Sequence, residues 1–148
     1  NFKWVKDFKD FYPILIKNKK KHNAKPTHSQ KELEVLQHTF PNDILQLMLY
    51  SDTLPIAGMT IFKANVKGAI LFYSMFDYKY NKMQPIPLLM HYIIQWGQKN
   101  NLIFIDYGIS HMPQADNPLA PSKSLIKFKE DFGCFGIIRN AYNKTIDE

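Results

Sequence analysis

The chain has 148 residues, of which 45% are hydrophobic and 14% aromatic, and its formal net charge is +6 at pH 7. This composition excludes a disordered chain and suits one domain with one core. No apolar run approaches the roughly 20 residues needed to cross a bilayer. The single cysteine, Cys134, excludes an internal disulfide and is expected to be a small buried hydrophobe. We therefore expect a cytoplasmic protein, and the start at Asn1 leaves a longer parent chain open.

The first predicted element is a helix over residues 1–21, which Pro13 is expected to kink or restart. A basic run covers residues 17–25, which are the end of this helix and the segment after it. Such a run is typical of a solvated helix face, and the alternative is a site for an anionic ligand or surface. It contains no aromatic residue to stack on bases, which argues against specific DNA binding. The apolar side chains that predict the helix are Phe2, Val5, Phe8, Phe11 and Tyr12.

The second predicted helix begins at a capping box. The Ser29 hydroxyl can accept from a first-turn amide, and Glu32 can reach back to the amide of Ser29. A helix should therefore begin at Gln30 and end before Pro41. Its inward face should carry Leu33, Leu36 and Phe40.

Three apolar strands follow, joined by short turns, so we expect an antiparallel meander. Their ranges are residues 43–50, 54–64 and 69–76. A loop over residues 77–85 then leads into a helix over residues 86–99. The prolines in the first turn of this helix are tolerated there.

The last third of the chain alternates strand and helix. Residues 102–109 should form a strand parallel to the third strand, because a helix crossover separates the two. A helix over residues 122–132 should bury Leu125, Phe128 and Phe132 and end in a left-handed turn at Gly133. A final strand is expected over residues 135–140, with Tyr142 packed near its end. The order predicts an α+β fold with a mixed sheet.

Several short phrases occur along the chain in a fixed order. They are Pro26-Thr27-His28-Ser29, Glu32-Leu33, Phe40-Pro41, Ile56-Ala57-Gly58, residues 104–110 and residues 125–133. In this order and spacing they resemble the GNAT-fold acyltransferases, in particular the branch near the Fem-type (FemAB-like) peptidyltransferases and their CoA-using relatives. The resemblance covers about residues 22–142 and implies one GNAT-like domain, in which the meander and a parallel strand pair open a cleft with helices on both faces.

The resemblance implies an N-acyltransferase that uses acyl-CoA, in the first instance acetyl-CoA, and an amine acceptor that attacks the thioester directly. The acceptor would be a small molecule or a peptidoglycan precursor. One alternative is Fem-type aminoacyl transfer from charged tRNA to a cell-wall precursor. Another is a non-catalytic binding module, because a fold does not fix a function.

The resemblance also places the donor. Backbone groups of Met75 and Phe76 would pair with the pantetheine arm, and a loop would meet the pyrophosphate. That loop comprises Asn81, Lys82, Met83 and Gln84. Residues 80–85 contain no glycine, although CoA-binding members of the family usually place glycines here so that amides close on the phosphates. Either Lys82 supplies a side-chain contact instead, or the donor site is degenerate.

The candidate catalytic groups each have a plainer alternative. Asp106 could accept a proton or orient the acceptor, or else cap a turn or pair with a lysine. Lys129 could stabilise an oxyanion or bind an acidic donor, or be an exposed helix lysine. His28 could be a general base or a loop histidine bonded to backbone. Tyr107 could protonate the leaving thiolate or be an ordinary sheet residue, and Ser110 could donate to the thiolate or be a turn residue. The histidines show no metal-ligand spacing, so we predict no metal site.

Overall fold

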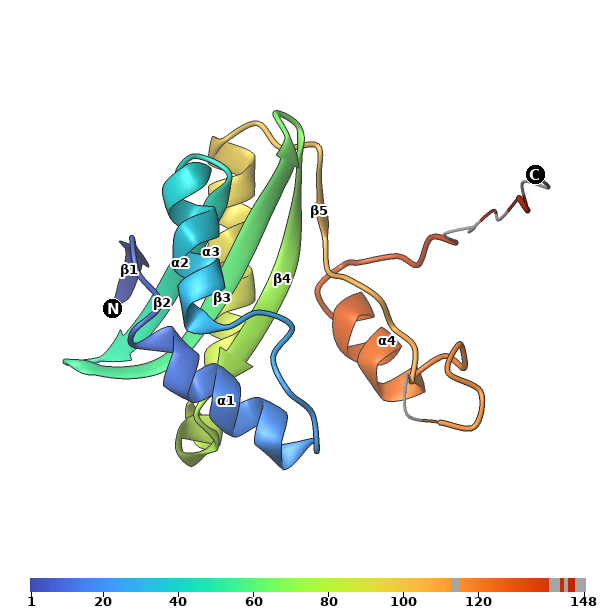
Figure 1. Ribbon diagram of the computed structural model, residues 1–148, viewed down its shortest axis with the longest axis horizontal. Coiled ribbons are helices and arrows are strands. Elements are labelled where there is room, and N and C mark those ends of the chain that lie inside the picture. The colour runs from blue at the N-terminus through green and yellow to red at the C-terminus, as the bar shows by residue number, and fades with distance from the viewer. Residues whose placement is uncertain (113–114, 139–141, 143, 146–148) are drawn as a thin grey trace. The chain divides into compact units, whose positions relative to one another are not determined.

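The computed structural model describes residues 1–112, 115–138, 142 and 144–145. The chain divides into two compact units, Asn1–Gly108 and Ile109–Glu148. The first unit contains a five-stranded sheet, in the order β1-β2-β3-β4-β5, with α1 and α2 on one face and α3 on the other (Figure 1). The strands are β1 (Phe2–Val5), β2 (Ile44–Ser51), β3 (Leu54–Asn65), β4 (Gly68–Phe76) and β5 (Phe104–Asp106). The helices are α1 (Phe11–Lys21), α2 (Gln30–Thr39), the 3₁₀ helix η1 (Tyr78–Met83), α3 (Pro85–Lys99) and α4 (Lys123–Glu130).

The mixed sheet confirms the predicted α+β class. The first four strands are antiparallel to their neighbours, and β5 runs parallel to β4. The three meander strands and α3 agree with the sequence prediction to within two residues at each end. Among the described residues, no helix has both the length and the apolar character needed to cross a membrane.

The predicted helix over residues 1–21 is wrong in its first half, because this half forms β1 and a turn. Phe2 and Trp4 alternate onto one face of β1, where they contact aromatic rings of α3. These apolar residues therefore alternate as in a strand and do not follow the helical spacing, because β2 is available as a pairing partner. Helix α1 begins at Phe11, so Pro13 lies in the first turn, where no intrahelical amide bond is lost.

Helix α2 begins as predicted. Ser29 Oγ accepts from the amide of Glu32, and Glu32 Oε2 accepts from the amide of Ser29 at 2.6 Å. The buried face is Leu33 and Gln37, and Phe40 is half exposed beyond the end of the helix, which corrects the predicted face. Gln37 is buried because its amide donates to Val5 O of β1.

The core on the α1 and α2 face joins these helices to the middle strands. Its fully buried members cannot tolerate voids without loss of stability. They are Phe8, Phe11, Leu15, Leu33 and Met48, with Ile14, Tyr50 and Tyr73 at their edge.

The predicted loop over residues 77–85 is instead the 3₁₀ helix η1, capped by the Asp77 side chain. The predicted strand over residues 102–109 is also too long, because β5 spans only three residues. Asp106 Oδ1 accepts from the amide of Gly108 at 2.7 Å, and Gly108 has a φ of 74°. This tight turn ends the strand, because a left-handed residue cannot continue a β ladder.

The second unit holds α4 and the segments on either side of it. Gly133 ends this helix region with a φ of 78°, as predicted. The rings of Phe128 and Phe132 are in contact, but both side chains are only partly buried and Leu125 is exposed, contrary to the predicted buried face. Residues 135–138 do not form the predicted strand, and Ile138 is 90% exposed; residues 139–140 lie outside the described residues. Tyr142 is also exposed. No described strand pairs with this segment, and strand-forming residues need a partner to form a ladder.

Candidate functional site

Near the middle of its pairing with β3, strand β4 contains one extra residue. Thr60 and Ile61 are consecutive on β3, but they pair with Tyr73 and Leu71, so Phe72 is an extra residue. Such a β-bulge bends the strand and increases its local twist. The bulge lies just beyond the point where β5 stops pairing with β4. The bend therefore accompanies the separation of the two parallel strands.

The last pair between β4 and β5 is Ile70 with Asp106. Residues 71–76 of β4 have no strand beside them on this side in the described part of the chain. We call residues 71–76 on this side the open edge. An unpaired strand edge offers main-chain donors and acceptors to an extended ligand.

Alternation along β4 determines which residues face the open edge. The amide of Asp77 donates to Ile56 O at 2.8 Å, so Asp77 is directed toward β3. In an antiparallel pair the direction alternates with each residue. Met75 lies two residues before Asp77, so its main-chain groups are also directed toward β3. Phe76 and Ser74 lie between these positions in the alternation and direct their main-chain groups to the open edge. Of the two residues expected to pair with a donor, Phe76 has the suitable orientation.

The carbonyl of Phe76 already has a partner that sequence reasoning missed. Asn18 is only 5% exposed, and its Nδ2 donates to Phe76 O and to Ile14 O. A polar residue four positions after buried Ile14, on the inward stripe of α1, is the signal that would have identified it. The buried Ser74 Oγ was also missed, and it lacks a hydrogen-bond partner among the described residues.

The segment that follows β4 differs from a glycine-rich phosphate loop. All of residues 81–84 are exposed, and Gln84 adopts the left-handed conformation, with φ 47° and ψ 55°. Pro85 and Pro87 contribute no amide to the start of α3, and the amide of Leu88 bonds to Gln84 O at 3.4 Å. The start of α3 therefore has few free donors for an anion, since helix N-termini bind anions through unpaired amides.

An ion pair joins α1 to the start of this segment. Lys17 Nζ lies 3.0 and 2.9 Å from the two carboxylate oxygens of Asp77, which also accepts from the amide of Lys79. Partial burial opposes ionisation of Asp77, but these hydrogen bonds outweigh it, so the pKa of Asp77 is lowered.

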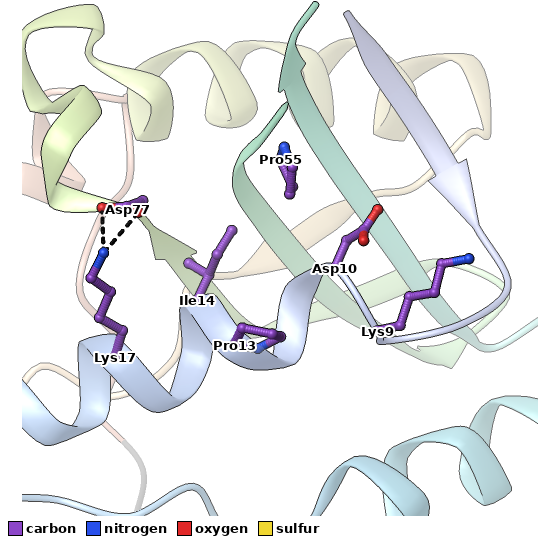
Figure 2. Close-up of a pocket in the computed structure, with 7 residues that line it drawn as sticks. All are labelled: Lys9, Asp10, Pro13, Ile14, Lys17, Pro55 and Asp77. Carbon is purple, nitrogen blue, oxygen red and sulfur yellow. Dashed lines mark hydrogen bonds and ion pairs between the residues drawn. The ribbon is translucent and has the colours of Figure 1, made fainter. Parts of the chain in front are cut away.

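The ion pair forms one side of a cavity of about 290 Å³ (Figure 2). The cavity lies between α1 and the start of β3, and none of the site residues expected from the sequence lines it. We therefore locate the candidate site at the open edge of β4, the strand that carries Met75 and Phe76, and not in this cavity. The cavity is lined by Lys9, Asp10, Pro13, Ile14, Lys17, Pro55 and Asp77.

His28 lies in the connection between α1 and α2 and packs against the bulge of β4. Its ring centroid is 5.4 Å from that of Phe72, and its carbonyl accepts from the hydroxyl of Tyr12. The adjacent amide of Thr27 donates to the hydroxyl of Tyr73 at 3.0 Å. His28 Nδ1 is buried without a hydrogen-bond partner among the described residues, so a ligand group or a water molecule is needed to satisfy it.

Asp106 and Tyr107 lie at the end of the first unit, and both are half-buried. The bond from the Gly108 amide shows that Asp106 caps the turn, which is the plainer of its two expected roles. This bond uses one carboxylate oxygen, and a carboxylate can accept further hydrogen bonds.

Ser110 and Lys129 come together within the second unit. Lys129 Nζ donates to Ser110 Oγ and to Ile109 O, both at 2.8 Å. Partial burial lowers the pKa of Lys129, although the nearby Cys134 opposes the shift. Burial raises the pKa of the Cys134 thiol, with Lys129 opposing, and Cys134 is partly exposed, not buried as expected. Lys129 is therefore not simply an exposed helix lysine, because two hydrogen bonds hold its ammonium group.

Neither a family model nor a curated protein matches the sequence. Solved structures do match. A possible acetyltransferase from Clostridium difficile 630 has a TM-score of 0.73 and 10% identity, over 100% of this chain and 98% of the other. The aminoglycoside 6'-N-acetyltransferase AAC(6')-Ih from Acinetobacter baumannii has a TM-score of 0.64 and 16% identity, over 100% and 99%. Ard1 from Thermoplasma volcanium has a TM-score of 0.62 and 13% identity, over 90% and 80%.

These identities are too low to show a shared activity, but the agreement over nearly the whole chain shows a shared fold. None of these structures points to the Fem-type branch. The mixed sheet, with its antiparallel strands, single parallel pair and covering helices, is the fold of the GNAT acetyltransferases.

Proposed function

We propose that the protein is an N-acyltransferase that moves an acyl group, in the first instance acetyl, from a CoA thioester to an amine. The observation that carries this proposal is the open edge of β4, where a bulge and the end of β5 leave main-chain groups without a neighbouring strand. A pantetheine arm contains amide groups and can pair with such an edge in the way an extended peptide does. The fold shared with acetyltransferases supports the same conclusion.

The donor would follow the open edge with its thioester toward the bulge and its pyrophosphate toward residues 81–84. Because the start of α3 offers few amides, the charge of Lys82 becomes the main attraction for the phosphates in that loop. A side-chain ammonium is a solvated point charge, so donor binding should weaken markedly with added salt.

The reaction would be direct. The neutral amine nitrogen attacks the thioester carbonyl carbon, the carbon–sulfur bond breaks, and the CoA thiolate leaves while the amine loses a proton. We assign the proton-accepting role to His28, whose ring packs against Phe72 at the bulge of β4. Within the first unit, Asp106 would orient the acceptor, and Tyr107 would protonate the thiolate. The role expected for Lys129 and Ser110 of the second unit, the stabilisation of developing negative charge, stays a separate prediction.

The acceptor is proposed to be a small molecule with a primary amine. Four of the similar structures are aminoglycoside acetyltransferases, which makes aminoglycosides a reasonable first group of compounds to test. A peptidoglycan-precursor amine belongs in the same panel.

Transfer from charged tRNA is the second candidate, and the basic run motivates it. Three lysines of α1 are already engaged, however. Lys17 pairs with Asp77, while Lys19 and Lys21 lie over the rings of tyrosines. A phosphate backbone would have to compete with these contacts, so we favour the CoA donor.

Titration calorimetry with acetyl-CoA, together with an assay of thiol release over a panel of amines, tests the proposal. We expect saturable binding and thiol release that depends on one class of amine. Lys82→Ala should weaken binding and reduce its salt dependence, with exposed Lys20→Ala as the matched control. Absence of binding at millimolar acetyl-CoA would overturn the proposal, and binding of charged tRNA at low salt would favour the second candidate.

A further inference from the structure

We propose that Asn18 is a positioning residue for the acyl donor. It holds the carbonyl of Phe76, so that the main chain of this last residue of the open edge has one fixed orientation, with its amide directed to the pantetheine arm. This inference rests on the proposed function, and it assigns to α1 a part in donor binding that the sequence did not indicate.

The Asn18 side chain is buried and held in place. Its Nδ2 donates to Ile14 O, one turn earlier in α1, and to Phe76 O across the sheet edge. A buried amide left without partners costs about 1–3 kcal/mol, so both bonds are expected to persist. The side chain is consequently an anchor between the helix and the last residue of β4.

The neighbouring contacts form a clamp at the same place. Lys17 pairs with Asp77, the next residue after β4. Lys21 Nζ lies 3.5 Å from the centroid of the Tyr78 ring, and His22 Nε2 lies 3.1 Å from the Tyr78 hydroxyl. The second half of α1 thus contacts three consecutive residues where β4 passes into η1.

The clamp has a specific consequence for the donor. In a β-strand the amide and carbonyl of one residue point to the same side, so the amide of Phe76 is directed to the open edge along with its carbonyl. Asn18 occupies the carbonyl, which leaves the amide as the group of Phe76 that is offered to a ligand carbonyl. Fixing this geometry before binding avoids part of the ordering cost.

The clamp also makes the proposal testable, because the ion pair and the Tyr78 contacts remain when Asn18 is changed. Asn18→Asp keeps the shape but replaces the donor amide by a group that accepts only, facing two carbonyl oxygens. We expect KM for acetyl-CoA to rise about 2- to 12-fold. This corresponds to the loss of one hydrogen bond, that between the Phe76 amide and the donor, at about 0.5–1.5 kcal/mol. The acceptor KM and kcat should change by less than a factor of about two. Lys20→Ala, an exposed change on the same helix, is the control.

An equal rise in both KM values, or unchanged donor affinity in a folded Asn18→Asp protein, would overturn the inference. A second measurement does not depend on the variant. On addition of acetyl-CoA to the wild-type protein, the NMR signal of the Phe76 amide should shift, and an unmoved signal with donor bound would also overturn it. If the wild-type protein fails to bind acetyl-CoA, the proposed function itself fails. Failure of the Asn18 inference alone is recognised by a wild-type protein that still binds acetyl-CoA.

Discussion

The ring of His28 lies against the ring of Phe72, with centroids 5.4 Å apart and planes inclined by 58°. Phe72 is the extra residue of the β4 bulge and also stacks on Phe62 at 4.5 Å. The connection between α1 and α2 is therefore held at the point where β4 leaves β5. This contact links a candidate general base to the open edge.

Replacement of His28 tests that role. For His28→Gln we expect kcat to fall by about 10²- to 10⁴-fold, because a positioned base contributes on that order. Thermal unfolding should change little, since the ring is only partly buried. Exposed His38→Gln on α2 is the matched control. A His28→Gln enzyme with near wild-type kcat would show that this histidine is only a loop residue.

Gly58 is expected to be essential for packing. A Cβ at this position would lie 2.6 Å from Met48 Sδ, 2.7 Å from Phe11 Cδ2 and 2.9 Å from Gln46 Nε2. Overpacking of this kind costs about 1–3 kcal/mol, so Gly58→Ala should lower the free energy of unfolding by that amount. Urea denaturation measures it, with Gly136→Ala, whose Cβ would meet no atom within 4 Å, as the control. Equal stability of the two variants would contradict the packing described.

The hydroxyl of Tyr50 should ionise at a higher pH than that of an ordinary tyrosine. Burial, and then the hydrogen bond that its hydroxyl donates to Asp10, raise the pKa of Tyr50 to about 12. The folded state holds this proton more tightly than the unfolded chain, whose value is about 10. The resulting stabilisation is complete below about pH 10 and is lost as the pH rises through about 12.

Ultraviolet absorbance of tyrosinate should therefore include a late-titrating group that is absent in Tyr50→Phe. Asp10→Asn should bring this group closer to its ordinary value. If Tyr50→Phe leaves the whole titration curve unchanged, the assignment to Tyr50 is wrong.

A double-mutant cycle separates two roles of Lys129. If its main role is to hold Ser110 through the 2.8 Å hydrogen bond, Lys129→Met and Ser110→Ala should reduce activity by similar factors and act non-additively. If the ammonium acts on the reacting thioester, Lys129→Met should lower kcat much further than Ser110→Ala. Lys127→Met, which removes only an exposed ion pair with Asp131, is the control for lost charge on α4.

The sequence by itself determined the elements whose signals are local. The capping box of Ser29 and Glu32 fixed the start of α2, because both partners lie within one turn. The apolar runs with short turns determined the antiparallel meander, and the crossover helix predicted that β5 would run parallel to β4. These features depend on neighbours in the chain, so periodicity and turn chemistry suffice.

Only the tertiary structure decided the features that depend on distant partners. Phe2 became a strand residue because it pairs with Leu49, and β5 ended at Asp106 because the following turn and the β4 bulge removed its partner. The contact between Asn18 and Phe76 spans 58 residues. No local pattern specifies such a contact, because its energy comes from burying an amide where two distant segments meet. The sequence therefore identified the strand that carries the candidate site, and the packing of α1 decided how that strand presents its end.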